Sequence, residues 1–243
     1  YALALSHTRS PSRDVGVGVF VESTSDAPQT ETLFMSVQKP KGKAWWAGNP
    51  SLAQPMRNSV RAALGYRWLH AEAFGSYVTN YIEPARATVD GINYQTYQNV
   101  DAVIAGVDLR ADSRYLDVDA AYTWADNRET GAPLSEIAPL RVRTRLSSPS
   151  WYGARAAVTH TWSDAQTRVD ADLGETATPS WNRVDLGVVY TRGLAELRME
   201  VENLADESYY RHLSYLRNPF ASGLRVYEPG RTVRLSLRVT ALP

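Results

Sequence analysis

The imidazole and phenol groups of the last long connection in this chain are its best candidates for holding a ligand. His212 follows Tyr209 and Tyr210 closely, and Tyr215 comes three residues later. An imidazole nitrogen can bind a metal, and phenol rings can stack on or hydrogen-bond a small molecule. We interpret His212 and Tyr215 as candidate ligand contacts, with ordinary loop packing as the alternative.

A second aromatic group lies far from these residues in the sequence. Trp45 and Trp46 stand together near the end of one irregular stretch, and Tyr94 and Tyr97 stand in another. Flat aromatic faces can stack on a chelate, or they can pack one loop against another. Trp45, Trp46 and Tyr94 are therefore candidate ligand contacts, and loop packing is the favoured alternative.

The sequence gives no positive sign of catalysis, of a metal site or of a cofactor. It has no cysteine, and no histidine or methionine has a neighbour at metal-ligand spacing. Ser10, Asp14 and Asp26 form no triad with His7 that their spacing supports. We predict that the chain is not an enzyme. Asp126, Asp164 and Asp172 would be the candidate acids of an enzyme.

Strict alternation of apolar and polar residues indicates the elements that carry these side chains. From Thr232 to Thr240, Val233, Leu235, Leu237 and Val239 share one side of an extended chain, while the other side carries arginine. The stretch from Ala195 to Asn203 repeats the pattern. Each stretch is predicted to be a strand with one apolar and one polar face.

The same pattern recurs along the chain and predicts ten antiparallel strands. They are 1–8, 58–68, 69–82, 99–109, 115–124, 140–146, 152–162, 184–190, 195–203 and 232–240. We interpret residues 9–54 as a long loop in which 15–21 extends a strand, and residues 83–97 as another loop. Long connections then alternate with tight turns to the end of the chain. Strands with short turns at one end and long loops at the other are typical of an outer-membrane barrel.

The composition is compatible with such a barrel. No stretch of eighteen apolar residues could form a transmembrane helix. A barrel strand escapes that test because every second side chain faces a polar lumen. Tyrosine and tryptophan, at 14 and 7, far outnumber the 4 phenylalanines, as in interfacial aromatic girdles. The zero net charge gives no indication of a nucleic-acid partner.

The charged residues of the predicted inner faces suggest a way to fix the strand register. Arg141, Arg143 and Arg145 share one face of a strand, and Asp117 and Asp119 share the inner face of the strand before it. We expect lumen solvation and cross-strand pairing here, with a substrate path as the alternative. The glutamates around Arg198 should form a ladder with Arg234 and Arg238. His160 shares a face with Val158 and Trp162, and we expect it to be an interfacial residue rather than a ligand.

Several segments resemble motifs of TonB-dependent outer-membrane receptors. SHTRSPS (6–12) and GNPSLAQP (48–55) resemble two segments that follow one another in that family. ENLADESYYRHLS (202–214) resembles its Asn-Leu-Phe-Asp-x-x-Tyr motif, and EPGRTVRLSL (228–237) its entry into the closing strand. The segment HLSYLRNPFASGLRVYEPGR (212–231) is most similar to receptors for copper or siderophores.

This resemblance implies that residues 1–243 are the C-terminal part of a 22-stranded β-barrel, present as an open half-barrel without the plug and the first strands. It implies uptake of a scarce metal or metal chelate across the bacterial outer membrane. The implied partners are outer-membrane lipid, the small chelate and the TonB complex, which acts through the missing plug. Edge strands are expected at 1–8 and 232–240.

Two alternatives remain at this point. A self-contained ten-stranded outer-membrane barrel could be a hydrolase or a passive pore. A soluble β-sandwich would cover the outward apolar faces with a second sheet.

Overall fold

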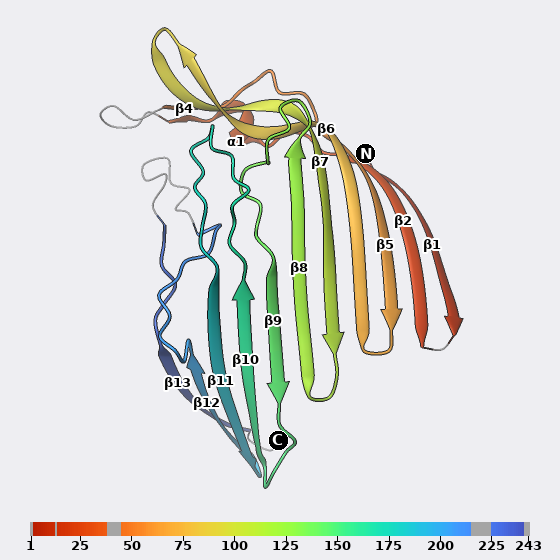
Figure 1. The fold of residues 1–243 in the computed structure, drawn as a ribbon, viewed down its shortest axis with the longest axis vertical. Coiled ribbons are helices and arrows are strands. Elements are labelled where there is room, and N and C mark those ends of the chain that lie inside the picture. The colour runs from red at the N-terminus through yellow and green to blue at the C-terminus, as the bar shows by residue number, and fades with distance from the viewer. Residues whose placement is uncertain (1, 13, 38–44, 215–224, 241–243) are drawn as a thin grey trace.

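A computed structural model describes residues 2–12, 14–37, 45–214 and 225–240 of the chain. They form one 13-stranded sheet, in which β3 and β4 lie off the main path and eleven strands follow one another as antiparallel neighbours. The strands of the main path are β1 (Ala2–Ser12), β2 (Val15–Ser25), β5 (Met56–Tyr66), β6 (Leu69–Val89), β7 (Ile92–Asp112), β8 (Leu116–Asn127), β9 (Arg141–Ser147), β10 (Ala154–Ser163), β11 (Trp181–Arg192), β12 (Ala195–Glu202) and β13 (Thr232–Val239). Figure 1 shows them as a curved wall.

The alternation of side chains gives this wall two different faces. Its outer face is apolar and exposed along the whole path, as Leu5 on β1, Val107 on β7 and Leu237 on β13 illustrate. All strands belong to one sheet, so no second sheet covers this face in the described part of the chain. The soluble β-sandwich is therefore excluded as the fold.

The connections differ between the two ends of the wall, as predicted. The turns at one end, which we call the short-turn end, are tight, as at Arg67–Trp68 and Gly193–Leu194. The other end, which we call the long-loop end, carries the connections 26–55, 128–140, 164–180 and 203–231, and the turn between β6 and β7.

The structure corrects the prediction of one long loop over residues 9–54. Residues 15–25 form the complete strand β2, which pairs with β1 on one side and β5 on the other. The stretch also contains α1 (Thr30–Phe34), β3 (Ser36–Val37) and β4 (Trp45–Ala47). The main path consequently has eleven strands rather than ten. The strand extension predicted at 15–21 lies within β2 and is confirmed, whereas the rest of β2 was not predicted.

The loop predicted at residues 83–97 is also wrong. β6 and β7 are 21 residues long each, and they stay paired to a tight turn at Asp90 and Gly91. Both turn residues have positive φ, 51° and 75°, as a two-residue hairpin turn requires. A register shift between Val78 and Tyr81, where Asn80 has a φ of 55°, breaks the alternation. The extra residue of that bulge shifts the alternation of apolar and polar side chains by one position. The rest of the hairpin therefore did not continue the pattern and was not predicted as strand.

The sheet is open at both edges, as expected for part of a larger barrel. Within the described residues, β1 pairs only with β2, and β13 pairs only with β12. Both edge strands run from the long-loop end to the short-turn end (Figure 1). Their directions agree because an odd number of strands lies between them on an antiparallel path. Direct closure of this sheet would therefore join β1 to β13 as parallel strands.

The charge ladder predicted on the last strands is present at Arg198 and Arg234, whereas Arg238 forms no ion pair among the described residues. Glu200 and Arg234 are register partners and their side chains approach to 3.6 Å. Arg198 on β12 lies 3.3 Å from Glu196 and 3.9 Å from Glu200. These half-exposed pairs contribute little stability each, but they penalise a register shift.

The small buried core of the wall lies at its long-loop end. The connection 128–140 folds back so that Leu134, which is fully buried, packs against Val78, Ala102 and Ala125. The one helix in the described part, α1, has five residues, and no helix there is long and apolar enough to cross a membrane.

Candidate ligand-binding site

The far half of the β6–β7 hairpin gathers three of the five predicted ligand contacts at the long-loop end. β4 pairs in parallel with β7, so that Trp45 lies opposite Tyr94 and Trp46 lies opposite Gln95. The indole ring of Trp46 is 6.0 Å from the ring of Tyr97, inclined by 51°. Backbone segments about fifty residues apart thus meet here, and we call the residues at this contact the β4–β7 group: Trp45, Trp46, Tyr94, Gln95 and Tyr97.

The segment GNPSLAQP (48–55) explains how β4 is held against β7. Asn49 donates a hydrogen bond from Nδ2 to Tyr97 O at 2.9 Å. Asn99 on β7 accepts the N–H of Ala53 at 2.7 Å. A Cβ at Gly48 would lie 2.5 Å from the carbonyl carbon of Leu33, so only glycine fits this approach to α1. The motif therefore fastens the irregular connection to the hairpin.

Two polar atoms of the β4–β7 group are buried and lack a hydrogen-bond partner among the described residues. They are the indole Nε1–H of Trp46, a donor, and Oε1 of Gln95, an acceptor. Buried polar atoms are normally paired, so an unpaired donor and an unpaired acceptor on register partners indicate a place where a polar ligand or water can bind. Gln95 was not among the predicted contacts, because a glutamine in a presumed loop carries no signal of ligand binding.

His212 lies apart from that group and is almost fully enclosed. Its side chain is 1% exposed, and that of its neighbour Glu175 is 4% exposed. The imidazole Nε2 is 3.0 Å from Glu175 Oε1, and Nδ1 is 3.1 Å from Thr178 Oγ1. The carboxylate only accepts, so Nε2 carries a proton. Both ring nitrogens thus bind protein atoms, and a ligand could reach His212 only by replacing them.

The Glu175 carboxylate joins three long connections. Oε1 also accepts the N–H of Glu136, and Oε2 accepts the N–H of Asp170, each at 2.8 Å. Burial by itself raises the pKa of Glu175, but the hydrogen bond from His212 and those from the two backbone N–H groups outweigh it, and the pKa lies below its ordinary value. We call Glu175, Thr178 and His212 the loop lock.

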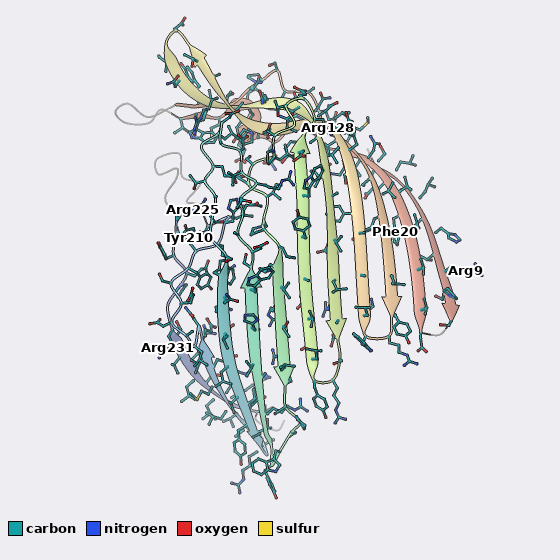
Figure 2. The ribbon with its side chains drawn as sticks, in the orientation of Figure 1. Arg9, Phe20, Arg128, Tyr210, Arg225 and Arg231 are labelled. Carbon is teal, nitrogen blue, oxygen red and sulfur yellow. The ribbon has the colours of Figure 1, made fainter. Side chains whose placement is uncertain are left out.

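Arg225 closes the loop lock from the far side of the 203–231 connection. Its guanidinium donates to the backbone oxygens of His212 and Thr176. It also lies 5.7 Å from the centre of the Tyr210 ring, and Figure 2 shows the two side chains together. Tyr215 lies outside the described residues, so its predicted role stays a prediction.

The residues considered for catalysis do not converge. Asp126 forms an ion pair with Arg168, and Asp164 accepts the N–H of the next residue. Asp172 is exposed in the 164–180 connection. Within the described ranges, no three histidine, aspartate or glutamate side chains are placed to hold a metal ion. His160 is exposed on the outer face, where Nε2 lies 3.0 Å from Asn182 Oδ1.

An antiparallel wall with an apolar outer face, a charged inner face and its long connections at one end is part of a transmembrane β-barrel. The family model described as "TonB dependent receptor-like, beta-barrel" matches residues 22–204. The chain belongs to this family of bacterial outer-membrane receptors.

Solved structures with the same fold include transporters and receptors of this family. The copper transporter OprC is 20% identical, with a TM-score of 0.81 over 97% of this chain and 38% of its own length. The ferric enterobactin receptor PfeA from Pseudomonas aeruginosa, in complex with enterobactin, is 19% identical, with a TM-score of 0.69 over 98% of this chain and 40% of its own. The siderophore receptor PirA from Acinetobacter baumannii is 15% identical, with a TM-score of 0.67 and the same two coverages. This chain therefore spans about two-fifths of these proteins, and no curated protein matches it.

Proposed function

We propose that this chain is the C-terminal part of an outer-membrane receptor that takes up a scarce metal or metal chelate, either copper or a siderophore. The β4–β7 group carries the proposal, because it places stacking rings and two unpaired polar atoms at the long-loop end of the wall. The printed functions of the similar proteins support this substrate class, since they are a copper transporter and siderophore receptors.

In this proposal each predicted contact has a distinct role. Trp45, Trp46 and Tyr94 contact the ligand, and Gln95 adds a hydrogen-bond acceptor. His212 acts by holding the loops that surround the entrance. The plug that would link the receptor to the TonB complex belongs to the part of the receptor outside this sequence, and the receptor itself performs no catalysis.

The self-contained barrel of the alternative is disfavoured by strand direction. Bacterial outer-membrane barrels of one chain have an even number of antiparallel strands. Eleven strands cannot close in that way, because β1 and β13 run in the same direction. An odd number of additional strands makes an antiparallel ring possible, as in a 22-stranded receptor.

Ligand binding by the full-length receptor tests the proposal. Titration with Cu²⁺ and with ferric enterobactin, followed by calorimetry, should give saturable binding of one of the two. Trp46→Ala should weaken that binding roughly tenfold, the scale of one lost stacking contact. Trp151→Ala, at the exposed short-turn end, is the control and should leave the affinity unchanged. Absence of binding to either probe would refute the proposed substrate class.

A further inference from the structure

Glu83 is a buried carboxylate on the far half of β6, and the proposed function does not use it. β5 pairs with β6 only as far as Thr79, so Glu83 lies beyond the part of the wall that spans the membrane. It is 3% exposed. Its Oε2 accepts a hydrogen bond from Asn127 Nδ2 at 3.1 Å, whereas Oε1 is buried and has no hydrogen-bond partner among the described residues. The protein thus encloses a carboxylate and leaves one of its oxygens without a donor.

The side chains around Glu83 do not neutralise it. Burial raises its pKa by more than the hydrogen bond from Asn127 lowers it, and the negative charges of Asp170 and Glu129 raise it further. Gln98, the register partner on β7, lies close enough to favour the charged form, but it makes no hydrogen bond of good geometry to Oε1.

Cations are also missing from the immediate surroundings. Within the described ranges, no arginine or histidine lies within 4.0 Å of Glu83, Glu129 or Asp170, although the neighbouring carboxylates Asp126 and Glu175 each have such a partner. We call Glu83, Glu129 and Asp170 the acidic cluster. Its charge is negative and is not offset by the described part of the chain.

The acidic cluster joins three segments of the long-loop end. Glu83 lies on β6, Glu129 lies in the connection that follows β8, and Asp170 lies in the connection that follows β10. The hairpin and the second of these connections are in contact, because a Cβ at Gly174 would lie 2.6 Å from Arg86 Nη2. A ligand of the cluster would therefore hold the β6–β7 hairpin against both connections.

A buried negative charge of this kind needs a counterion. Taking a carboxylate out of water costs far more free energy than one hydrogen bond recovers, so such a group binds a proton or a cation. A proton would neutralise Glu83 alone. A cation with a charge of two would satisfy Oε1 and also offset the charges of Glu129 and Asp170, so the second choice fits the whole cluster.

We propose that the acidic cluster binds a hydrated divalent cation, Ca²⁺ or Mg²⁺, at Glu83 Oε1. These hard cations take carboxylate oxygens, amide oxygens and water as ligands, and Gln98 offers an amide oxygen beside Glu83. No three acidic or histidine side chains in the described part of the chain are placed to hold a metal ion by themselves. Water therefore supplies further ligands and links the cation to Glu129 and Asp170.

This cation is a structural part of the receptor and not its transported substrate. A site made of oxygen atoms alone suits Ca²⁺ or Mg²⁺, whereas Cu²⁺ is better held by imidazole nitrogen. The inference goes beyond the proposed function and does not depend on which chelate the receptor carries. It predicts that divalent cations order the hairpin that carries the β4–β7 group.

Titration of the purified full-length receptor with CaCl₂ and, separately, with MgCl₂ tests the site by calorimetry. At least one cation should bind with a Kd of about 10⁻⁴–10⁻³ M, the range of extracellular calcium modules. Glu83→Gln should weaken that binding at least about tenfold, because it removes the charge at the ligand oxygen. Glu22→Gln, at an exposed carboxylate on β2, is the control and should leave the affinity unchanged. Absence of saturable binding, or the same isotherm in Glu83→Gln as in the unsubstituted receptor, would overturn the proposal.

Hydrogen exchange in residues 80–98 gives a second, structural readout. At a cation concentration ten times the Kd, opening of the hairpin should become about tenfold rarer in the unsubstituted receptor. Glu83→Gln keeps the shape of the side chain and removes the uncompensated charge, so it should fold normally and lose the response to the cation. Equal exchange with and without the cation in the unsubstituted receptor would reject the site.

Glu129→Gln tests the contact through water. It should weaken the cation only about threefold, because a charge that acts through water contributes less than a direct ligand. A loss as large as that of Glu83→Gln would contradict the placement of the cation at Glu83. None of these measurements uses copper or enterobactin, so a receptor that failed both of those titrations would still give an interpretable result here.

Discussion

Asn203 Nδ2 donates a hydrogen bond to Pro229 O at 3.3 Å, and so joins the two ends of the 203–231 connection. The same nitrogen reaches Glu207 O at 2.9 Å, and Oδ1 accepts the N–H of Glu207 at 2.9 Å. Asp206 Oδ1 accepts the N–H of Arg231 at 2.7 Å. The two motifs ENLADESYYRHLS and EPGRTVRLSL thus bind each other directly, and this clasp joins the start and the end of the 203–231 connection.

Asn203→Ala should lower the free energy of unfolding by about 2–3 kcal/mol, because it leaves buried backbone groups unpaired and places alanine at a φ of 53°. Asn203→Gly should recover the part of that loss due to the positive φ. Urea denaturation of the receptor measures both. Asn182→Ala, which removes an exposed hydrogen bond to His160, should change the stability by less than about 0.5 kcal/mol. An effect of Asn203→Ala as small as that of the control would contradict the clasp.

Glu175→Gln should open the loop lock. The neutral amide cannot accept all three hydrogen bonds, and its NH₂ group faces backbone donors, so we expect a local cost of about 2–3 kcal/mol. Hydrogen exchange should accelerate in residues 164–180 and 203–214 and stay unchanged in β10 and β11. Asp172→Asn, an exposed carboxylate of the same connection, should have no effect. Equal exchange in the two variants would show that Glu175 does not hold the loops.

The loop lock should also weaken in acid. The pKa of Glu175 in the folded protein lies below its ordinary value of 4.5. The stability that its carboxylate contributes is therefore complete above the pKa of the unfolded chain and is lost as the pH falls through the folded pKa. Exchange protection of residues 164–180, corrected for intrinsic rates, should stay constant from about pH 7 to about pH 5 and fall below the ordinary pKa. Loss of protection between about pH 7 and about pH 5 would assign the effect to another group.

Gly106→Ala should destabilise the centre of the wall. Its Cβ would lie 2.5 Å from Cζ of Phe74 and 2.7 Å from the backbone oxygen of Tyr122, so the ring that covers Gly106 must move. We expect a loss of about 1–3 kcal/mol in urea denaturation. Gly75→Ala is the matched control on the adjacent strand, because no atom lies within 4 Å of its Cβ. The result would oppose this account if both variants were equally stable.

The two edge strands should not meet in the receptor. Ser6→Cys combined in turn with Arg234→Cys, Ser236→Cys or Arg238→Cys should give no disulfide on oxidation. Arg198→Cys with Ser236→Cys is the positive control, since these residues are register partners on β12 and β13. A disulfide between β1 and β13 would mean that this chain closes on itself. It would support the alternative of a self-contained barrel that acts as a hydrolase or a passive pore.

The sequence alone determined the class of fold, the one-sided connections and the edge strands. Side chains alternate with a period of two in a strand, so the apolar residues at every second position from Val233 to Val239 predict one apolar face. The pattern predicted only residues 15–21 of β2 as strand, and it failed in the far half of the β6–β7 hairpin. There a bulge interrupted the period, while the hydrogen bonds to the neighbouring strand kept the chain extended.

The candidate site was only partly accessible from the sequence. The aromatic residues Trp45, Trp46 and Tyr94 were identified by type, but only the parallel pairing of β4 with β7 brought them together and added Gln95. His212 was identified as a ligand candidate, yet its partner Glu175 is 37 residues away in another loop. Contacts between distant loops leave no periodic trace in a sequence, because they depend on how the strands beneath place those loops. The local pattern therefore determined the wall, and only tertiary pairing decided which side chains meet at its long-loop end.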